Sequence, residues 1–194
     1  MLIVRNDPGE VESDLASGRL LCPACGVGVL ARWGFARFRS LRDGRGFRPR
    51  RGICGQEGCR TTHVLLPDVC LLDRVDAAEV IGSVLEAIVV AKEKLEDVAV
   101  GAGIPVETVR GWSKRLRKVA GAIAAHFSRW LLALMPGRRL PEPLAASAYA
   151  IELVGAAARA ASLCLGRRPP WSWASALSGG RLFSNTKSPW PTPD

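Results

Sequence analysis

The chain has 194 residues, which is enough for one ordinary domain or two small ones. A hydrophobic fraction of 48% and a charged fraction of 23% are those of a globular protein, so the composition excludes a wholly disordered chain. The net charge of +9 favours an anionic partner, and nucleic acid is the usual one. The start of the sequence turns acidic before a signal peptide could form, and no uncharged apolar run approaches the length of a membrane span. We therefore expect a cytoplasmic protein with no membrane partner.

The first predicted element is a short helix over residues 8–18, with a proline and acids in its first turn and a glycine at its end. Residues 20–59 are rich in glycine and arginine and predict two cysteine knuckles joined by a β-hairpin. The dipeptide Asp43-Gly44 predicts the turn of that hairpin, because it tolerates positive φ angles. Residues 61–72 are apolar with a proline and predict an extended linker.

Four cysteines stand in two closely spaced pairs, Cys22 with Cys25 and Cys54 with Cys59. Residues 26–53 separate the pairs, a length that accommodates a hairpin. Four thiolates satisfy tetrahedral zinc, and a short spacing lets each pair bind the same ion. The pattern therefore predicts a zinc ribbon with one structural Zn2+ per chain. Four protein ligands leave no open position on the metal, so this zinc is not expected to be catalytic.

Two other interpretations of the cysteines remain open. His63 follows Cys59 closely and could replace Cys54 as the fourth ligand, because the second pair has a longer spacing than the first. The four thiols could also be buried free cysteines. Cys70 and Cys164 stand alone in apolar surroundings and are expected to be small core residues.

The second part of the chain is predicted to be helical. Asp76 and Glu79 have capping-box spacing at the start of a helix that reaches about Lys92. Further helices are predicted from Leu95, from about Val106, over a packing stretch that ends before Pro136, and over 144–165. The fold class is mainly α with a small β zinc ribbon. The predicted domains are a helix and zinc ribbon (1–72), a helix-turn-helix domain (73–135), a C-terminal helical segment (136–166) and an irregular tail (167–194) whose last residues are frayed.

Residues 95–118 carry the pattern of a helix-turn-helix. Ala99 stands where a small side chain lets two helices approach, and Gly103 stands where the turn needs a positive φ angle. The remaining apolar positions of the motif are occupied by Val98, Ala102, Ile104, Val109 and Trp112. The alternative is a helical hairpin whose basic face is only solvated.

A recognition helix starting at about Val106 would place its exposed side chains in the major groove of DNA. Arg115 and Lys118 would continue as phosphate contacts. The candidate DNA-binding residues of this helix are Val106, Glu107, Thr108, Arg110, Gly111, Lys114 and Arg117.

The hairpin predicts a second DNA-facing element, because eight arginines and only one acid lie between Arg32 and Arg51. Its candidate DNA contacts are Arg37, Arg39, Arg48, Arg50 and Arg51. The hairpin also carries four aromatic residues, which we expect to form its small core rather than a platform for stacked bases; they are Trp33, Phe35, Phe38 and Phe47.

At these motifs the chain resembles an actinobacterial family of zinc-ribbon and helix-turn-helix proteins that is associated with mobile elements and has no settled biochemical activity. More loosely, it is similar to the N-terminal DNA-binding regions of insertion-sequence transposases. The resemblance implies DNA binding tied to transposition. The matching segments are Cys22–Gly26, Trp33–Arg37, Cys54–Cys59, Thr62–Pro67, Asp76–Gly82, Thr108–Trp112, His126–Trp130 and Arg168–Trp171.

The sequence thus predicts a protein that binds double-stranded DNA as an accessory or regulatory factor of a transposable element, with a transposase encoded nearby as a second partner. The alternatives are a transposase or transposase fragment, and a protein-interaction adaptor. We expect no enzyme and no catalytic residues, because only Glu142, Glu152 and Asp194 follow the helix-turn-helix as acids. His126 lies at helical spacing from Ile123 and Trp130 and is expected to be packed or solvated.

Overall fold

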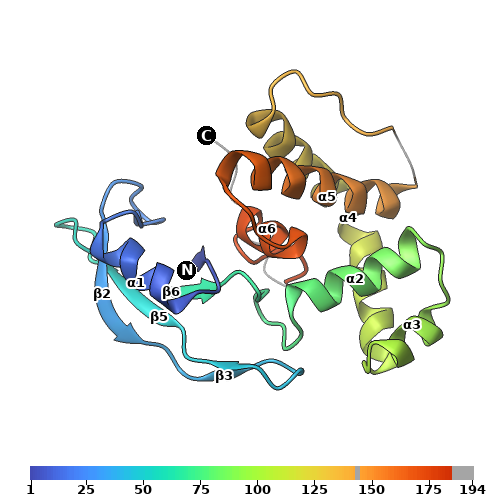
Figure 1. The fold of residues 1–194 in the computed structure, drawn as a ribbon, viewed down its shortest axis with the longest axis horizontal. Coiled ribbons are helices and arrows are strands. Elements are labelled where there is room, and N and C mark those ends of the chain that lie inside the picture. The colour runs from blue at the N-terminus through green and yellow to red at the C-terminus, as the bar shows by residue number, and fades with distance from the viewer. Residues whose placement is uncertain (143–144, 185–194) are drawn as a thin grey trace.

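The computed structural model describes residues 1–142 and 145–184, which form a β-rich half and a helical half (Figure 1). A four-stranded sheet has the order β1-β6-β5-β2. β1 (Leu2–Val4) pairs in parallel with β6 (Thr62–Pro67), and β5 (Arg50–Cys54) pairs antiparallel with both β6 and β2 (Leu30–Phe35). The fold class is confirmed at this level, because the described residues form six helices and a small mixed sheet.

The strand β6 corrects one prediction, because residues 61–72 were expected to be a linker. The segment up to Pro67 is paired on both sides, with β1 from the start of the chain and with β5 from the hairpin. Leu65 and Leu66 are almost completely buried as a result. The pairing with β1 joins residues more than sixty positions apart, and such a partner cannot be found from local pattern.

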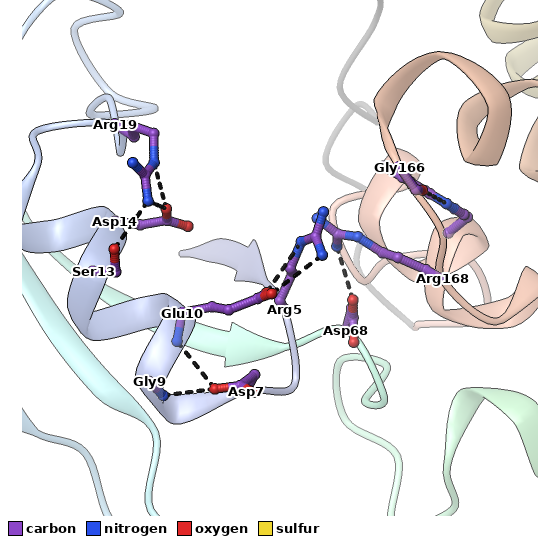
Figure 2. Close-up of polar contacts among 11 residues, drawn as sticks. Arg5, Asp7, Gly9, Glu10, Ser13, Asp14, Arg19, Asp68, Gly166 and Arg168 are labelled. Atoms are coloured by element: carbon purple, nitrogen blue, oxygen red, sulfur yellow. Dashed lines mark hydrogen bonds and ion pairs between the residues drawn. The ribbon is translucent and has the colours of Figure 1, made fainter.

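The predicted N-terminal helix is confirmed as α1 (Pro8–Ala16). Asp7 caps it by accepting hydrogen bonds from the backbone N–H groups of Gly9 and Glu10 at 2.7 and 3.0 Å, as Figure 2 shows. The helix packs on the sheet through Val11 and Leu15, which form a small core with residues of the strands.

The hairpin turn is confirmed, with Gly44 at a φ of 86° between the short strands β3 (Arg39–Ser40) and β4 (Gly46–Phe47). The predicted hairpin core is wrong. The side chains of Trp33, Phe35 and Phe38 are 51%, 52% and 66% exposed, and only Phe47 is half-buried.

A β-bulge accounts for part of this exposure. The register between β2 and β5 shifts between Arg32 and Phe35, where Gly34 adopts a φ of 89°. The core beneath the sheet is formed by aliphatic residues such as Leu30 and by α1, and it includes none of these rings. The ring of Phe38 lies on Gly46, where a Cβ atom would come within 2.3 Å of it.

Five helices build the other half around one apolar core: α2 (Ala78–Val89), α3 (Leu95–Gly101), α4 (Val106–Leu134), α5 (Ala146–Leu165) and α6 (Pro170–Leu177). The starts of α3 and α4 agree with the prediction. The basic helix and the packing helix that follows it are one continuous 29-residue helix, because Gly111 and Gly121 inside it do not interrupt it.

The predicted capping box at the start of α2 is wrong. The N-cap residue is Ala77, and none of the described side chains caps the helix. Asp76 is buried and instead accepts a hydrogen bond from Arg42 of the hairpin, with Nε and Oδ1 2.6 Å apart. An ion pair with a distant arginine has replaced the local cap.

The prediction of an irregular tail from residue 167 is wrong for its described part. Residues 170–177 form α6, and Trp171 and Trp173 are buried in the helical core together with Phe183. Trp171 lies directly on α2, where a Cβ atom at Gly82 would come within 1.9 Å of the indole. The predicted frayed end lies outside the described residues.

Two contacts connect the end of β6 to α6. Arg168 pairs with the buried Asp68 at 2.8 Å, as Figure 2 shows, and its guanidinium lies 4.4 Å from the centre of the Trp173 ring. The hydroxyl of Ser175 donates to the carbonyl of Cys70 at 2.6 Å. The C-terminal segment therefore touches both halves of the molecule.

One helix, α5, is long and apolar enough to cross a membrane by length and composition. Half of its apolar stretch is buried in the fold, and its buried side includes Leu153 and Val154. Such packing is typical of the core helix of a soluble protein.

Candidate metal centre and basic surfaces

The fold brings Cys22, Cys25, Cys54 and Cys59 together, with all four sulfur atoms within 4.8 Å of one another. The Sγ atoms of Cys22 and Cys59 are 3.8 Å apart, and those of Cys25 and Cys54 are 3.7 Å apart. The first pair stands in the loop before β2, and Cys54 ends β5, so the pairing of these two strands places the knuckles side by side. This cluster could hold a metal ion.

Backbone N–H groups point at the sulfur atoms, as they do around bound metals. The N–H of Ala24 lies 3.4 Å from the Cys22 sulfur, that of Gly28 3.3 Å from Cys25, and that of Gln56 3.4 Å from Cys54. Position 28 requires glycine, because a Cβ atom there would come within 2.3 Å of the Cys54 sulfur.

The thiols differ in acidity. Hydrogen bonding with Thr61 lowers the pKa of Cys59 to about 6, and the N–H of Gly28 lowers the pKa of Cys25. Burial raises the pKa of Cys54 to about 12. Cys59 thus favours the thiolate at neutral pH, the pKa of Cys25 is shifted in the same direction, and the buried Cys54 needs a nearby positive charge to ionise.

His63 is buried beside the cluster rather than in place of Cys54. Its Nε2 atom lies 3.2 Å from the Cys22 sulfur, and its Nδ1 atom lies 3.2 Å from the amino group of Met1. A ring in this position orients the Cys22 sulfur from outside the ligand set. Of the two lone cysteines, Cys70 is buried as predicted, but Cys164 is exposed at the end of α5, so its assignment to the core is wrong.

The helices α3 and α4 meet through a short turn at residues 102–105. Gly103 adopts a φ of 66°, and the N–H of Ile104 donates to the carbonyl of Ala99 at 3.0 Å. Ala99, Val109 and Trp112 are buried between these helices and the rest of the core, whereas Ala102 is exposed and does not contribute.

The predicted DNA-binding residues of α4 lie on its first turns. Glu107, Arg110, Gly111, Lys114 and Arg117 are exposed, and Val106 and Thr108 are half-buried. Arg110 pairs with two acids, Glu107 and Glu96 of α3, the second at 3.3 Å. No ion pair forms at Lys114 or Arg117 among the described residues. A surface depression runs along these turns and is lined by Arg74, Glu107, Thr108, Gly111, Trp112, Lys114, Arg115 and Lys118.

The arginines of the hairpin fall into two groups. Arg37, Arg39 and Arg48 are exposed. Arg50 pairs with Glu12 of α1 at 2.6 Å and covers the ring of Phe35 at 4.3 Å, and Arg51 donates to the Thr62 hydroxyl at 2.9 Å. Sequence reasoning missed these partners, because they lie on other elements.

The two predicted DNA-binding surfaces approach each other at the hairpin end, which Figure 1 shows extending toward the helical half. Arg39 of β3 lines a depression together with Arg74, and Arg74 also lines the depression along α4. His126 is buried, with its Nε2 atom 2.9 Å from the carbonyl of Leu177, which is the packed role that was expected. Of the late acids, Glu142 and Glu152 are exposed, and Asp194 lies outside the described residues.

Comparison with family models, curated proteins and solved structures found no match to this chain. The resemblance to a mobile-element family therefore stays a prediction.

Proposed function

We propose that this protein binds double-stranded DNA through a helix-turn-helix formed by α3 and α4, with a structural zinc ribbon as a second, basic module. The observation that carries the proposal is the α3–turn–α4 unit, in which a positive-φ glycine joins two helices packed through Ala99 and Trp112. The second helix of this unit, α4, exposes Arg110, Lys114 and Arg117 to solvent.

Zinc is the metal that the cysteine cluster fits best. Four sulfur atoms at about 2.3 Å from a tetrahedral zinc stand about 3.8 Å from one another. The separations within the pairs Cys22–Cys59 and Cys25–Cys54 are 3.8 and 3.7 Å. The bound ion would stabilise the ribbon, and with four thiolates around it there is no position for a reacting water. Metal analysis of protein purified without added zinc should give about one equivalent per chain.

Base contacts are proposed for the exposed side chains near the start of α4. Lys114 is the clearest candidate, because it is exposed and pairs with no described acid, whereas Arg110 must leave Glu96 and Glu107 to reach a base. Each side chain that reads a base should weaken specific binding by about 1–3 kcal/mol when it is replaced by alanine. Arg129, exposed on the same helix, provides a matched control.

Phosphate contacts of the ribbon are proposed for Arg37, Arg39 and Arg48. Replacing them should weaken binding to every sequence and flatten its salt dependence. Replacing Arg50 and Arg51 should mainly disturb the ribbon, because these two side chains hold α1 and β6.

The decisive experiment is the binding of zinc-loaded protein to short duplexes as salt is raised. We expect an affinity that falls steeply with salt, as counterion release requires. Absence of binding at low salt would mean that the basic surfaces contact only solvent, and it would favour the alternative of a protein-interaction adaptor. The role as an accessory or regulatory factor of a transposable element depends on the resemblance alone, and addition of a transposase encoded beside the gene would test it.

A further inference from the structure

The depression along the first turns of α4 combines two arginines that are held in place by neighbouring carbonyl groups. Arg74, in the segment before α2, donates from Nε to the carbonyl of Phe183 at 3.1 Å and also through its Nη2 group. Arg115 of α4 donates to the next carbonyl, that of Ser184. Two successive peptide groups of the C-terminal segment thus fix two guanidinium groups on one surface.

This arrangement concentrates positive charge, because more cations than acids line the depression and Asp73 and Asp76 offset the charge of Arg74 only in part. Lys114 and Lys118 line the same depression, and Glu107 is the one acid among its lining residues. Glu107 is itself paired with Arg110. Burial and the positive charge of Arg115 lower the pKa of Arg74, which means that the two guanidinium groups repel each other across a partly desolvated surface.

We propose that Arg74 and Arg115, with Lys118, form a clamp for one phosphate group of the DNA backbone, a proposal that rests on the proposed DNA binding by α4. An arginine has five N–H donors in a planar fork, and the carbonyl contacts use only part of them. Arg74 uses its Nε and Nη2 groups for these contacts and Arg115 uses its Nη2 group, which leaves the Nη1 groups for a ligand. A phosphodiester can accept from both forks and remove their repulsion.

The clamp gives the C-terminal segment a role in binding. Phe183 and Ser184 stand next to each other after α6 and touch residues that are more than sixty positions away in the chain. By aiming Arg74 and Arg115, they set the position of α4 on the duplex, since phosphate contacts determine register and orientation rather than sequence preference.

The test uses the zinc-loaded full chain and a labelled duplex of arbitrary sequence, with affinity measured by fluorescence anisotropy between about 50 and 200 mM salt. Replacement of Arg74 or Lys118 by glutamine should weaken binding and reduce the slope of log affinity against log salt by about 0.9, the value for one lost phosphate. Arg129→Gln is the matched control, because it removes one positive charge from α4 at a position about 16 Å from Lys118 along the helix, and it should leave the slope unchanged.

Lys118 is exposed and forms no hydrogen bond or ion pair within the described part of the chain, so Lys118→Gln keeps the test valid if Arg74→Gln unfolds the protein. Duplex binding with equal slopes for wild type, Lys118→Gln, Arg74→Gln and Arg129→Gln would overturn the clamp and leave the proposed function intact. Failure of the wild type to bind any duplex would overturn both. Inorganic phosphate is the second probe: displacement of the duplex by millimolar phosphate only in proteins that retain Arg74 would assign the site to free phosphate instead of the DNA backbone.

Discussion

The ribbon half and the helical half of this protein are stabilised in different ways. The helical half has a large apolar core with contributions from α2 to α6. The ribbon half has two small clusters of buried residues. One includes Leu41 and Leu66 and extends to Ala77 before α2, and the other includes Cys22 and Cys54 of the four-cysteine cluster. A β-rich unit of this size buries too little apolar surface to be stable alone, and a metal is one of the usual supplements.

We therefore expect the two halves to unfold under different treatments. Chelation of the metal should unfold the ribbon and leave the helices folded, whereas a cavity in the helical core should destabilise the helices and leave the ribbon folded. The contacts between the halves, among them Arg42 with Asp76 and Arg168 with Asp68, decide how far one failure spreads to the other.

The largest effect is expected from loss of the metal. Removal of zinc by a chelator, or the substitution Cys22→Ser, should unfold the ribbon, because structural zinc contributes about 10–16 kcal/mol to such sites. Circular dichroism should retain most of the helical signal while amide resonances of β2 and β5 collapse. Cys164→Ser is the control, because that thiol is exposed and outside the cluster. A Cys22→Ser protein with full zinc content and an unchanged melt would contradict the assignment.

A cavity in the helical core should have the opposite result. Leu153 of α5 is completely buried, so Leu153→Ala should cost about 2–5 kcal/mol of the free energy of unfolding. Leu163 on the same helix is 78% exposed, and Leu163→Ala should change stability by less than about 0.5 kcal/mol. Zinc content should stay at one equivalent in both variants. Equal denaturant midpoints for the two would mean that α5 does not pack as described.

The ion pair between the halves should have a smaller effect. Asp68 is 5% exposed and accepts from Arg168, so Asp68→Asn should cost about 1.5–3 kcal/mol, the value of a hydrogen bond to a charged group. Asp14 forms an otherwise similar pair with Arg19 at the surface of α1, seen in Figure 2, and Asp14→Asn should cost only about 0.2–1 kcal/mol. Thermal melts that separate into two steps for Asp68→Asn alone would show that this pair couples the halves.

The smallest expected effect is a pH dependence within the helical half. Burial lowers the pKa of His126, so the folded protein binds fewer protons there than the unfolded chain does. This contribution to stability is complete above the unfolded pKa of about 6.5 and is lost as the pH falls below it. Between about pH 7 and pH 5 the melting temperature of wild type should therefore fall more than that of His126→Gln. Parallel pH profiles of the two proteins would show that His126 does not titrate with unfolding.

Local pattern determined several parts of this protein. The short spacings of the cysteine pairs predict a shared metal, and the sulfur atoms do meet. Asp43-Gly44 predicts the hairpin turn, and the glycines and helix-forming stretches predict where α3 and α4 begin. These features depend on residues that are close in sequence, because the backbone angles and the spacing of side chains act over a few positions.

Tertiary structure decided the features that need a distant partner. Residues 62–67 form a strand rather than the predicted linker because they pair with β1. The segment predicted to be an irregular tail joins the core because Trp171 packs on Gly82 of α2. The exposure of Trp33 and Phe38 and the pairing of Arg50 with Glu12 belong to the same class. In each case the side chain or strand has more than one favourable environment, and the packing of distant segments selects one of them, which no local window of the sequence contains.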